Sequence, residues 1–177
     1  MSIQCVNDGY DQSREGTQAP TRDAMTEQFL TFTIGEEEYG VDIMTVREIK
    51  GWTETTRLPN SPEYMRGVMN LRGLIIPIFD LRARFTGALT HATPKHVTIV
   101  LAAGARTVSI LADTVSDILT VGSKEIKPSP EVETTIDQRY VCGLIAVEQR
   151  MVVVLDIEKL LAKSLDAAEA LQAEITH

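Results

Sequence analysis

The sequence predicts a mainly β fold of two small, related β-barrel subdomains, with a C-terminal helix packed on them. Residues 67–81 return in outline at 143–157, since both copies start with Gly, run apolar beyond a polar tip and stop at Asp. Short stretches of alternating apolar residues, which are typical of strands, recur in the same order in each half. A unit that occurs twice predicts paired subdomains, because solenoids usually stack three or more repeats.

The first half begins with a predicted hairpin. Residues 29–34 alternate between apolar and polar side chains and predict a strand. A turn at 35–38 leads to a returning strand at 39–43. The three glutamates of this turn are most simply a solvated face. Residues 46–49 follow as a helical turn or as the end of a strand.

The second half repeats this order. Residues 97–101 predict a strand, 104–106 a turn and 108–111 the returning strand. Residues 115–118 then correspond to 46–49 of the first half. The two halves are therefore expected to share one strand arrangement.

Closure of each half into a barrel follows from its small size. Four or five short strands cannot form a two-layer sandwich alone, but they can curl into a barrel without exposed edges. Pro77 within a predicted strand supports this prediction, because proline marks an edge, a bulge or a barrel corner. From Asp156, a suitable N-cap residue, apolar residues follow helical spacing to Ile175 and predict the packed C-terminal helix.

The chain divides into three predicted parts. Residues 1–26 are polar without periodic apolar positions and predict a disordered tail. Residues 27–156 form the predicted domain, with subdomains at approximately 27–85 and 95–156, and residues 157–177 form the helix.

The overall charge excludes several function classes. The net charge is −8 and the isoelectric point is near 4.9, which argues against binding of nucleic acid or anionic membrane. The chain lacks an apolar run of about 18 residues, so no direct membrane insertion is expected. It also lacks a basic-then-apolar signal pattern at its start, and we expect a cytoplasmic protein.

Residues that could perform chemistry do not form a recognisable constellation. The histidines, His91, His96 and His177, lack the spacing of metal ligands, and no phosphate loop or nucleophile elbow occurs. Asp80 and Asp156 could suggest a carboxylate pair, but their equivalent places in the repeat are explained by helix capping. We therefore expect no enzymatic activity, no catalytic residue, no cofactor and no metal.

Four arginines, Arg66, Arg72, Arg82 and Arg84, lie close together in the sequence of this acidic chain. Arg72 occupies a predicted hairpin tip, just before Gly73. It could simply end the hairpin, or it could present a forked donor to a carboxylate of a partner, which Arg does better than Lys. Both interpretations stay open at this point.

Longer motifs resemble one known family. Residues 29–43 and 46–49 resemble the opening of the chemotaxis coupling protein CheW family. Residues 62–82 look like the central signature of that family, and 113–118 and 156–161 match its second half. The similarity covers most of the chain outside the N-terminal tail, which most members lack in this form.

The resemblance implies a fold and a function. The fold is a pair of five-strand, SH3-like or OB-like barrels around a shared apolar core. The function is that of a non-enzymatic adaptor or scaffold, which couples the cytoplasmic tip of methyl-accepting chemoreceptors to the histidine kinase CheA in a signalling array. Since the regulatory domain of that kinase has the same fold, like surfaces can pair head to tail, and other CheW-like proteins become further partners.

The resemblance also implies binding positions. It places partner-binding residues at Val46, Glu48, Gly67, Arg72 and Val115. Val46 and Val115 are equivalent in the repeat, and Gly67 is expected to allow a close backbone approach.

Two alternatives stay open. One is a CheW-like adaptor for a receptor–kinase pathway outside chemotaxis. The other is a small barrel that binds a ligand or an oligonucleotide, although the acidic charge and the absence of a stacked aromatic set argue against nucleic acid.

Overall fold

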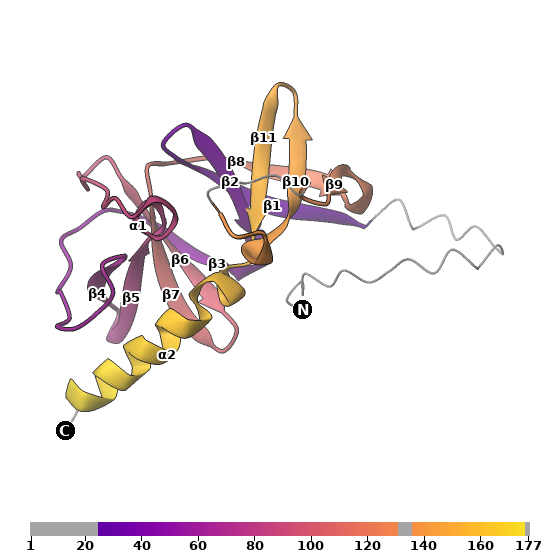
Figure 1. Cartoon of the computed structure of the whole chain (residues 1–177). Helices are drawn as coiled ribbons and strands as arrows, with labels where there is room; N and C mark the ends of the chain where they lie inside the picture. The colour runs from indigo at the N-terminus through magenta and orange to yellow at the C-terminus, as the bar shows by residue number, and fades with distance from the viewer. Residues whose placement is uncertain (1–24, 131–135, 176–177) are drawn as a thin grey trace.

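The protein folds into two β-sheets that share a core, with a long helix across them (Figure 1). The structure is a computed structural model that describes residues 25–130 and 136–175. The predicted disordered tail, 1–26, lies outside the described residues except for Met25 and Thr26.

The first sheet has six strands in the order β8-β1-β2-β11-β10-β9, and the second has five in the order β3-β6-β7-β5-β4. The strands of the six-stranded sheet are β1 (Thr26–Ile34), β2 (Glu37–Asp42), β8 (Thr114–Gly122), β9 (Ile126–Lys127), β10 (Val141–Val147) and β11 (Arg150–Leu155). The strands of the five-stranded sheet are β3 (Val46–Gly51), β4 (Met65–Leu71), β5 (Leu74–Asp80), β6 (Val97–Ala103) and β7 (Arg106–Ala112). The helices are α1 (Leu81–Thr86) and α2 (Ile157–Ile175), and short 3-10 turns are η2 (Ile43–Thr45), η3 (Ser123–Glu125) and η4 (Gln138–Tyr140).

Each half of the chain contributes its first hairpin to one sheet and its remaining strands to the other. The hairpin β1–β2 joins β8 to β11 of the second half, whereas β6–β7 joins β3 to β5 of the first half. The pairings match by symmetry, since β5–β7 and β2–β11 are both parallel and β3–β6 and β1–β8 are both antiparallel. The sequence repeat is therefore real, but the halves 27–85 and 95–156 do not fold as separate sheets.

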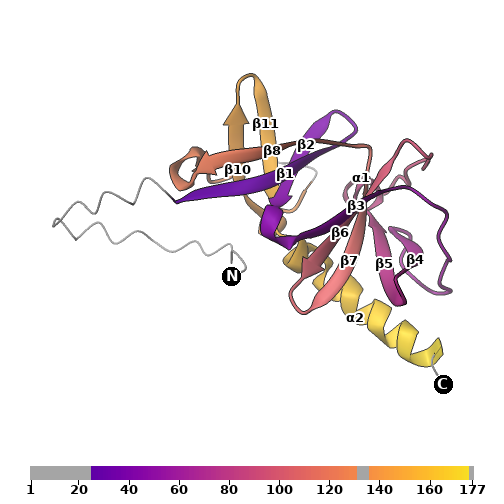
Figure 2. The same ribbon diagram turned by 180° about the vertical axis from the view of Figure 1, so that it is seen from behind.

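This exchange places β1 inside the molecule. Leu30 and Phe32 join the large core cluster, while Phe29 joins a second, smaller cluster on the opposite face of the strand. The hairpin thus buries apolar side chains on both faces, which favours a central position over an edge. The two views in Figures 1 and 2 show the two sheets side by side, with α2 running along the five-stranded sheet.

The predicted mainly β class and the packed C-terminal helix are confirmed, but the two predicted five-strand barrels are sheets of six and five strands that do not close as barrels. The ladders leave both sheets open, with one addition in the five-stranded sheet. Thr56, in the segment after β3, forms an isolated bridge with Val68 of β4. β3 and β4 are the two edge strands of that sheet. The bridge therefore links the segment that follows one edge strand to the other edge strand. Pro77 pairs with Val68 just before β5 begins to pair with β7, as expected for a partly free edge.

Both repeated aspartates cap helices, as predicted. Asp80 accepts a hydrogen bond from the backbone N–H of Ala83, and Asp156 accepts one from Lys159. Helix α2 then buries Leu160, Leu161 and Leu165 against the large core cluster. Residues 46–49, which were predicted as a helical turn or strand end, belong to the edge strand β3.

One local prediction is wrong. Glu38, which we expected on a solvated face, is buried, and Arg150 of β11 donates two hydrogen bonds to its carboxylate, at 3.2 and 3.1 Å. The parallel pairing of β2 with β11 brings these residues together, and sequence periodicity does not report such pairing.

Tyr39 makes the stability of the fold depend on pH in the alkaline range. Burial, and then its hydrogen bond to Glu37 at 2.5 Å, raise the pKa of this phenol above its ordinary value. The neutral form is favoured in the folded state, so this contribution to stability is complete below about pH 10 and is lost above it. We expect the urea midpoint of the wild type to fall more steeply between pH 9 and 11 than that of Tyr39→Phe; equal slopes would refute this.

Candidate functional site

The hairpin tip between β4 and β5 is the most distinctive exposed feature among the predicted binding residues. Its two turn residues, Arg72 and Gly73, have φ values of 53° and 88°. Positive φ at both central residues is typical of a type I′ turn, which matches the twist of the flanking strands. The left-handed backbone conformation of Arg72 costs roughly 1–2 kcal/mol. The turn therefore keeps arginine at this position despite an unfavourable backbone conformation.

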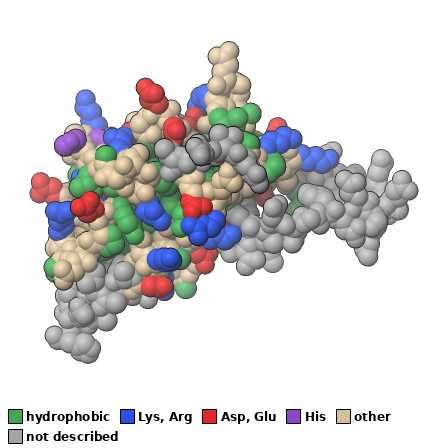
Figure 3. Space-filling model, in the orientation of Figure 1, with side chains coloured by type: hydrophobic (Ala, Val, Ile, Leu, Met, Phe, Trp, Pro, Cys, Tyr) green, Lys and Arg blue, Asp and Glu red, His purple; other side chains and the backbone are tan. Residues whose placement is uncertain are grey.

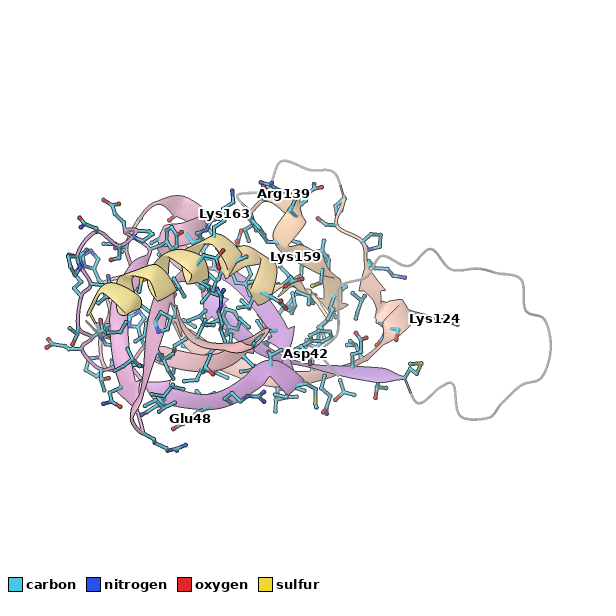
Figure 4. The ribbon with its side chains drawn as sticks, turned by 90° about the horizontal axis from the view of Figure 1, so that it is seen from below. Asp42, Glu48, Lys124, Arg139, Lys159 and Lys163 are labelled. Carbon is cyan, nitrogen blue, oxygen red and sulfur yellow. The ribbon has the colours of Figure 1, made fainter. Side chains whose placement is uncertain are left out.

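Arg72 forms an ion pair with Glu48 of β3. The distance from Nη2 of Arg72 to Oε2 of Glu48 is 3.4 Å, and the Arg72 side chain is 81% exposed. Figure 4 shows Glu48 projecting from the side of the five-stranded sheet that faces away from α2. Two residues from distant parts of the sequence, both predicted to bind a partner, therefore meet on one surface.

Two exposed apolar side chains follow this turn at the start of β5, on opposite faces of the strand. Leu74 and Ile75, directly after the turn, are 54% and 47% exposed. Exposed apolar side chains next to an arginine are typical of protein-docking surfaces, which are enriched in Arg and poor in Lys and Glu at their centre. We call Glu48, Arg72, Leu74 and Ile75 the tip surface.

Gly67 positions the tip surface from inside the molecule. It is buried in β4 with φ of 141°, and a Cβ at this position would lie 2.3 Å from the carbonyl oxygen of Thr56. Thr56 and Val68 exchange two backbone hydrogen bonds, at 2.9 and 3.1 Å, next to this contact. The missing side chain of Gly67 thus lets the segment after β3 pair with β4, which fixes the hairpin relative to Glu48.

Val46 and Val115 occupy matching places at the points where the chain crosses between sheets. Val46 begins β3 and Val115 lies near the start of β8, each an edge strand of its sheet. Both side chains are half-buried and pack against the large core cluster. Val46 shares a strand with Glu48, whereas Val115 belongs to the other sheet and lies outside the tip surface.

The four arginines that lie close in sequence do not form one patch. Arg66 lies over the ring of Trp52 and 4.0 Å from Asp80, and Arg82 pairs with Asp113 at 2.5 Å. Arg84 lies between the rings of Tyr64 and Tyr140. Arg72 is the one of the four that points away from the body of the fold, which favours the partner-binding interpretation over simple hairpin termination.

The described residues contain no group of three or more His, Cys, Asp or Glu side chains that could hold a metal ion. Asp80 is fully buried and its carboxylate accepts three hydrogen bonds, from Ala83 and from the backbone and hydroxyl of Thr90. A carboxylate saturated in this way has a structural role. Within residues 25–130 and 136–175, no helix is long and apolar enough to cross a membrane.

Sequence reasoning missed Leu74, Ile75 and Thr56. The first two belong to an apolar run that predicts a strand, and the run does not show which of its residues emerge at the turn. Thr56 carries no signal of its own, because its importance arises from a backbone contact with Gly67.

Residues 28–165 match the family described as CheW-like domain. The chain is 46% identical over 136 residues to the chemotaxis protein CheW of Klebsiella aerogenes, covering 77% of this chain and 82% of that protein. It is 42% identical over 137 residues to the probable chemotaxis protein CheW of Rhizobium etli, covering 77% and 88%. The crystal structure of the scaffolding protein TtCheW from Thermoanaerobacter tengcongensis is similar, with a TM-score of 0.71, 30% identity and coverage of 77% and 88%.

Proposed function

We propose that this chain, which belongs to the CheW-like domain family and is similar to chemotaxis proteins CheW and to a CheW scaffolding protein, couples chemoreceptors to the histidine kinase CheA. In this proposal, it binds the cytoplasmic tip of methyl-accepting chemoreceptors and the regulatory domain of the kinase at the same time. It works in the cytoplasm, in arrays held at the inner membrane by those receptors.

The tip surface is the observation that carries this proposal. An exposed arginine, paired with Glu48 and flanked by Leu74 and Ile75, offers charge-directed and apolar contacts within a few residues. A forked guanidinium binds carboxylates in a defined orientation, while the apolar side chains contribute by losing contact with water. We propose Val46, Glu48, Gly67, Arg72 and Val115 as partner-binding positions, with Gly67 acting through the placement of the hairpin.

Signal transfer then follows from differential binding. An adaptor without catalytic groups changes kinase activity only if it binds one conformational state of its partners more tightly than the other. The symmetry-related sheets also offer two different docking faces on one chain, and unlike faces that pair head to tail build rings or extended arrays. Other CheW-like proteins are therefore further partners in this proposal.

A two-partner binding assay tests the proposal. The full chain is immobilised and exposed to the kinase regulatory domain, to a receptor-tip fragment and to both together. We expect binding of each alone and a ternary complex when both are present. Binding to neither partner would overturn the coupling function while leaving the family membership intact.

Arg72→Glu is expected to weaken binding of at least one partner about tenfold or more, because it replaces a forked donor with a like charge for any partner carboxylate. Its stability should stay within about 0.5 kcal/mol of the wild type, since exposed ion pairs contribute little. Lys124→Glu is the matched control: it makes the same charge reversal at an exposed position far from Glu48 (Figure 4). Equal effects of the two variants would show that net charge, and not the tip surface, governs binding.

Exchanging the charges of Glu48 and Arg72 tests whether this ion pair binds a partner or only holds the hairpin in place. The double variant Glu48→Arg/Arg72→Glu keeps an ion pair between β3 and the hairpin but reverses its polarity. We expect it to bind as weakly as Arg72→Glu alone. Recovery of wild-type affinity would instead assign the pair a purely structural role.

A further inference from the structure

A hollow of about 330 Å³ lies beside Trp52, in the first half of the chain. Four of its lining residues belong to the segment between β3 and β4, one belongs to β4 and one follows α1. In chain order they are Trp52, Glu54, Thr55, Arg57, Arg66 and Leu89. No residue of the tip surface lines this hollow, so the two features are separate. We call it the Trp52 hollow.

Arg66 brings unused hydrogen-bond donors to the Trp52 hollow. Its side chain is 19% exposed, and its guanidinium makes no hydrogen bond with the described residues: the Asp80 carboxylate lies 4.0 Å away, and the centre of the Trp52 ring 5.4 Å away. Its donor nitrogens reach solvent, because within the described chain only Oδ2 of Asp42 and Nε of Arg84 are buried without a partner. A guanidinium fork that is held in place with its donors free is suited to binding a carboxylate.

Hydrogen bonds within the fold fix the walls of this hollow. Oγ1 of Thr55 donates to the backbone oxygen of Arg66 at 3.1 Å, which ties the segment after β3 to β4. Thr90 donates its backbone N–H and its hydroxyl to Asp80, at 2.8 and 2.9 Å, and thereby holds the neighbouring Leu89. The buried Asp80 thus positions both the guanidinium and an apolar wall. The hollow is formed without a ligand, as is usual for small-molecule sites.

The charges around the Trp52 hollow favour a ligand with a single negative charge. Arg57 and Arg66 are its cations, Glu54 is an anion of its lining, and Asp80 lies 4.0 Å from Arg66 in the interior. Because two cations and two anions balance, a dianion or a phosphate would be repelled by Glu54 and Asp80, whereas one carboxylate matches one guanidinium fork. Figure 3 likewise shows acidic and basic side chains next to each other at the end of the molecule that carries β4 and α1.

We propose that the Trp52 hollow binds a small monocarboxylic acid with a short apolar stem. The carboxylate accepts hydrogen bonds from Arg66 and Arg57, and the stem packs against Trp52 and Leu89. A free acid is favoured over an acidic side chain of a protein partner because Arg66 is recessed, at 19% exposure, whereas Arg72 of the tip surface is 81% exposed. The proposal does not rest on receptor–kinase coupling, since every group involved belongs to this chain.

The indole of Trp52 makes binding measurable, because the chain has one tryptophan. The full chain, labelled with a nitrogen isotope, gives one indole N–H signal in a two-dimensional NMR spectrum, and isovalerate is titrated at constant pH and ionic strength. We expect a saturable shift of this signal with millimolar affinity, and binding about tenfold or more weaker for isovaleramide and for succinate. A shift that does not saturate, or equal affinity for isovaleramide or succinate, would overturn the proposal.

Substitutions of three arginines locate the binding. Arg66→Met keeps an apolar stem over Trp52 and should weaken isovalerate binding about tenfold or more. Arg57→Gln, at an exposed position that leaves the fold intact, should weaken it about fivefold. The matched control is Arg47→Gln, which removes the same charge at an exposed position outside this hollow and should change the affinity less than about twofold. Equal losses for Arg57→Gln and Arg47→Gln would show attraction by overall charge and would refute the site.

Competition with the proposed protein partners separates a free acid from a partner's carboxylate. Saturating isovalerate should leave the binding of the kinase regulatory domain and of the receptor-tip fragment unchanged, and Arg72→Glu should leave the affinity for isovalerate unchanged. Displacement of either partner by isovalerate would assign the hollow to a carboxylate of that partner, and the free-acid proposal would be wrong. Because the titration uses this chain alone, failure of the coupling function would leave its result unaffected.

Discussion

Gly67→Ala is expected to lower the free energy of unfolding by about 3 kcal/mol or more and to reduce partner binding at the tip surface. The backbone φ of 141° is strained for any residue with a Cβ, and the new atom would lie 2.3 Å from the carbonyl oxygen of Thr56. Because that neighbour is backbone and is hydrogen-bonded to Val68, relief requires breaking the bridge between the two edges of the five-stranded sheet. Urea denaturation measures the stability, and binding of both proposed partners measures the consequence.

Gly73→Ala is the control that separates strain from collision. Gly73 also has a positive φ, of 88°, but a Cβ there would meet nothing within 4 Å. Its expected cost is about 1–2 kcal/mol, from backbone conformation alone. If both variants lose the same stability, the contact between Gly67 and Thr56 does not hold the hairpin in place.

Asp80→Ala is expected to cost about 3–5 kcal/mol, the largest loss we expect from a single side chain. The carboxylate is fully buried and accepts hydrogen bonds at 3.3, 2.8 and 2.9 Å, while Arg66 lies 4.0 Å away. Removal leaves the backbone N–H and hydroxyl of Thr90 without a partner in the interior and takes a counter-charge from Arg66. Calorimetry or urea denaturation at neutral pH measures the effect.

The repeat supplies the matched control, because Asp156 occupies the equivalent place before α2. Its side chain is 16% exposed and accepts one backbone hydrogen bond, from Lys159 at 3.1 Å. Asp156→Ala should therefore cost about 1 kcal/mol, as for an ordinary N-cap. Equal losses at the two positions would mean that capping alone accounts for Asp80, and that its bonds to Thr90 contribute little.

Gly67→Ala and Asp80→Ala are expected to affect different parts of the structure. Gly67 sets how the β4–β5 hairpin lies against β3, so its replacement should disturb recognition at the tip surface as well as stability. Asp80 fixes the end of β5 and the segment that follows α1, away from Glu48 and Arg72. A folded fraction of Asp80→Ala should accordingly bind partners with nearly unchanged affinity.

Local features were predictable from sequence for local physical reasons. The strand pattern identified β1, β2, β6 and β7, because successive side chains of a strand point to opposite faces, whereas β3 and β8 were predicted only as a helical turn or a strand end. The aspartates before α1 and α2 were correctly predicted as caps, since an Asp side chain bonds backbone N–H groups two or three residues on. The family motif and the exposed Arg72 at a hairpin tip were also evident in the order of residues.

Only the tertiary structure shows which distant segments of the chain pair with each other. A periodic pattern reports which face of a strand is buried but not which strand lies beside it, so the exchange of hairpins between the halves left no local signal. The same holds for the ion pair of Glu48 with Arg72, the approach of Thr56 to Gly67, and the burial of Glu38 by Arg150. Each depends on the packing of two apolar sheets around one core, because that packing determines which surfaces meet.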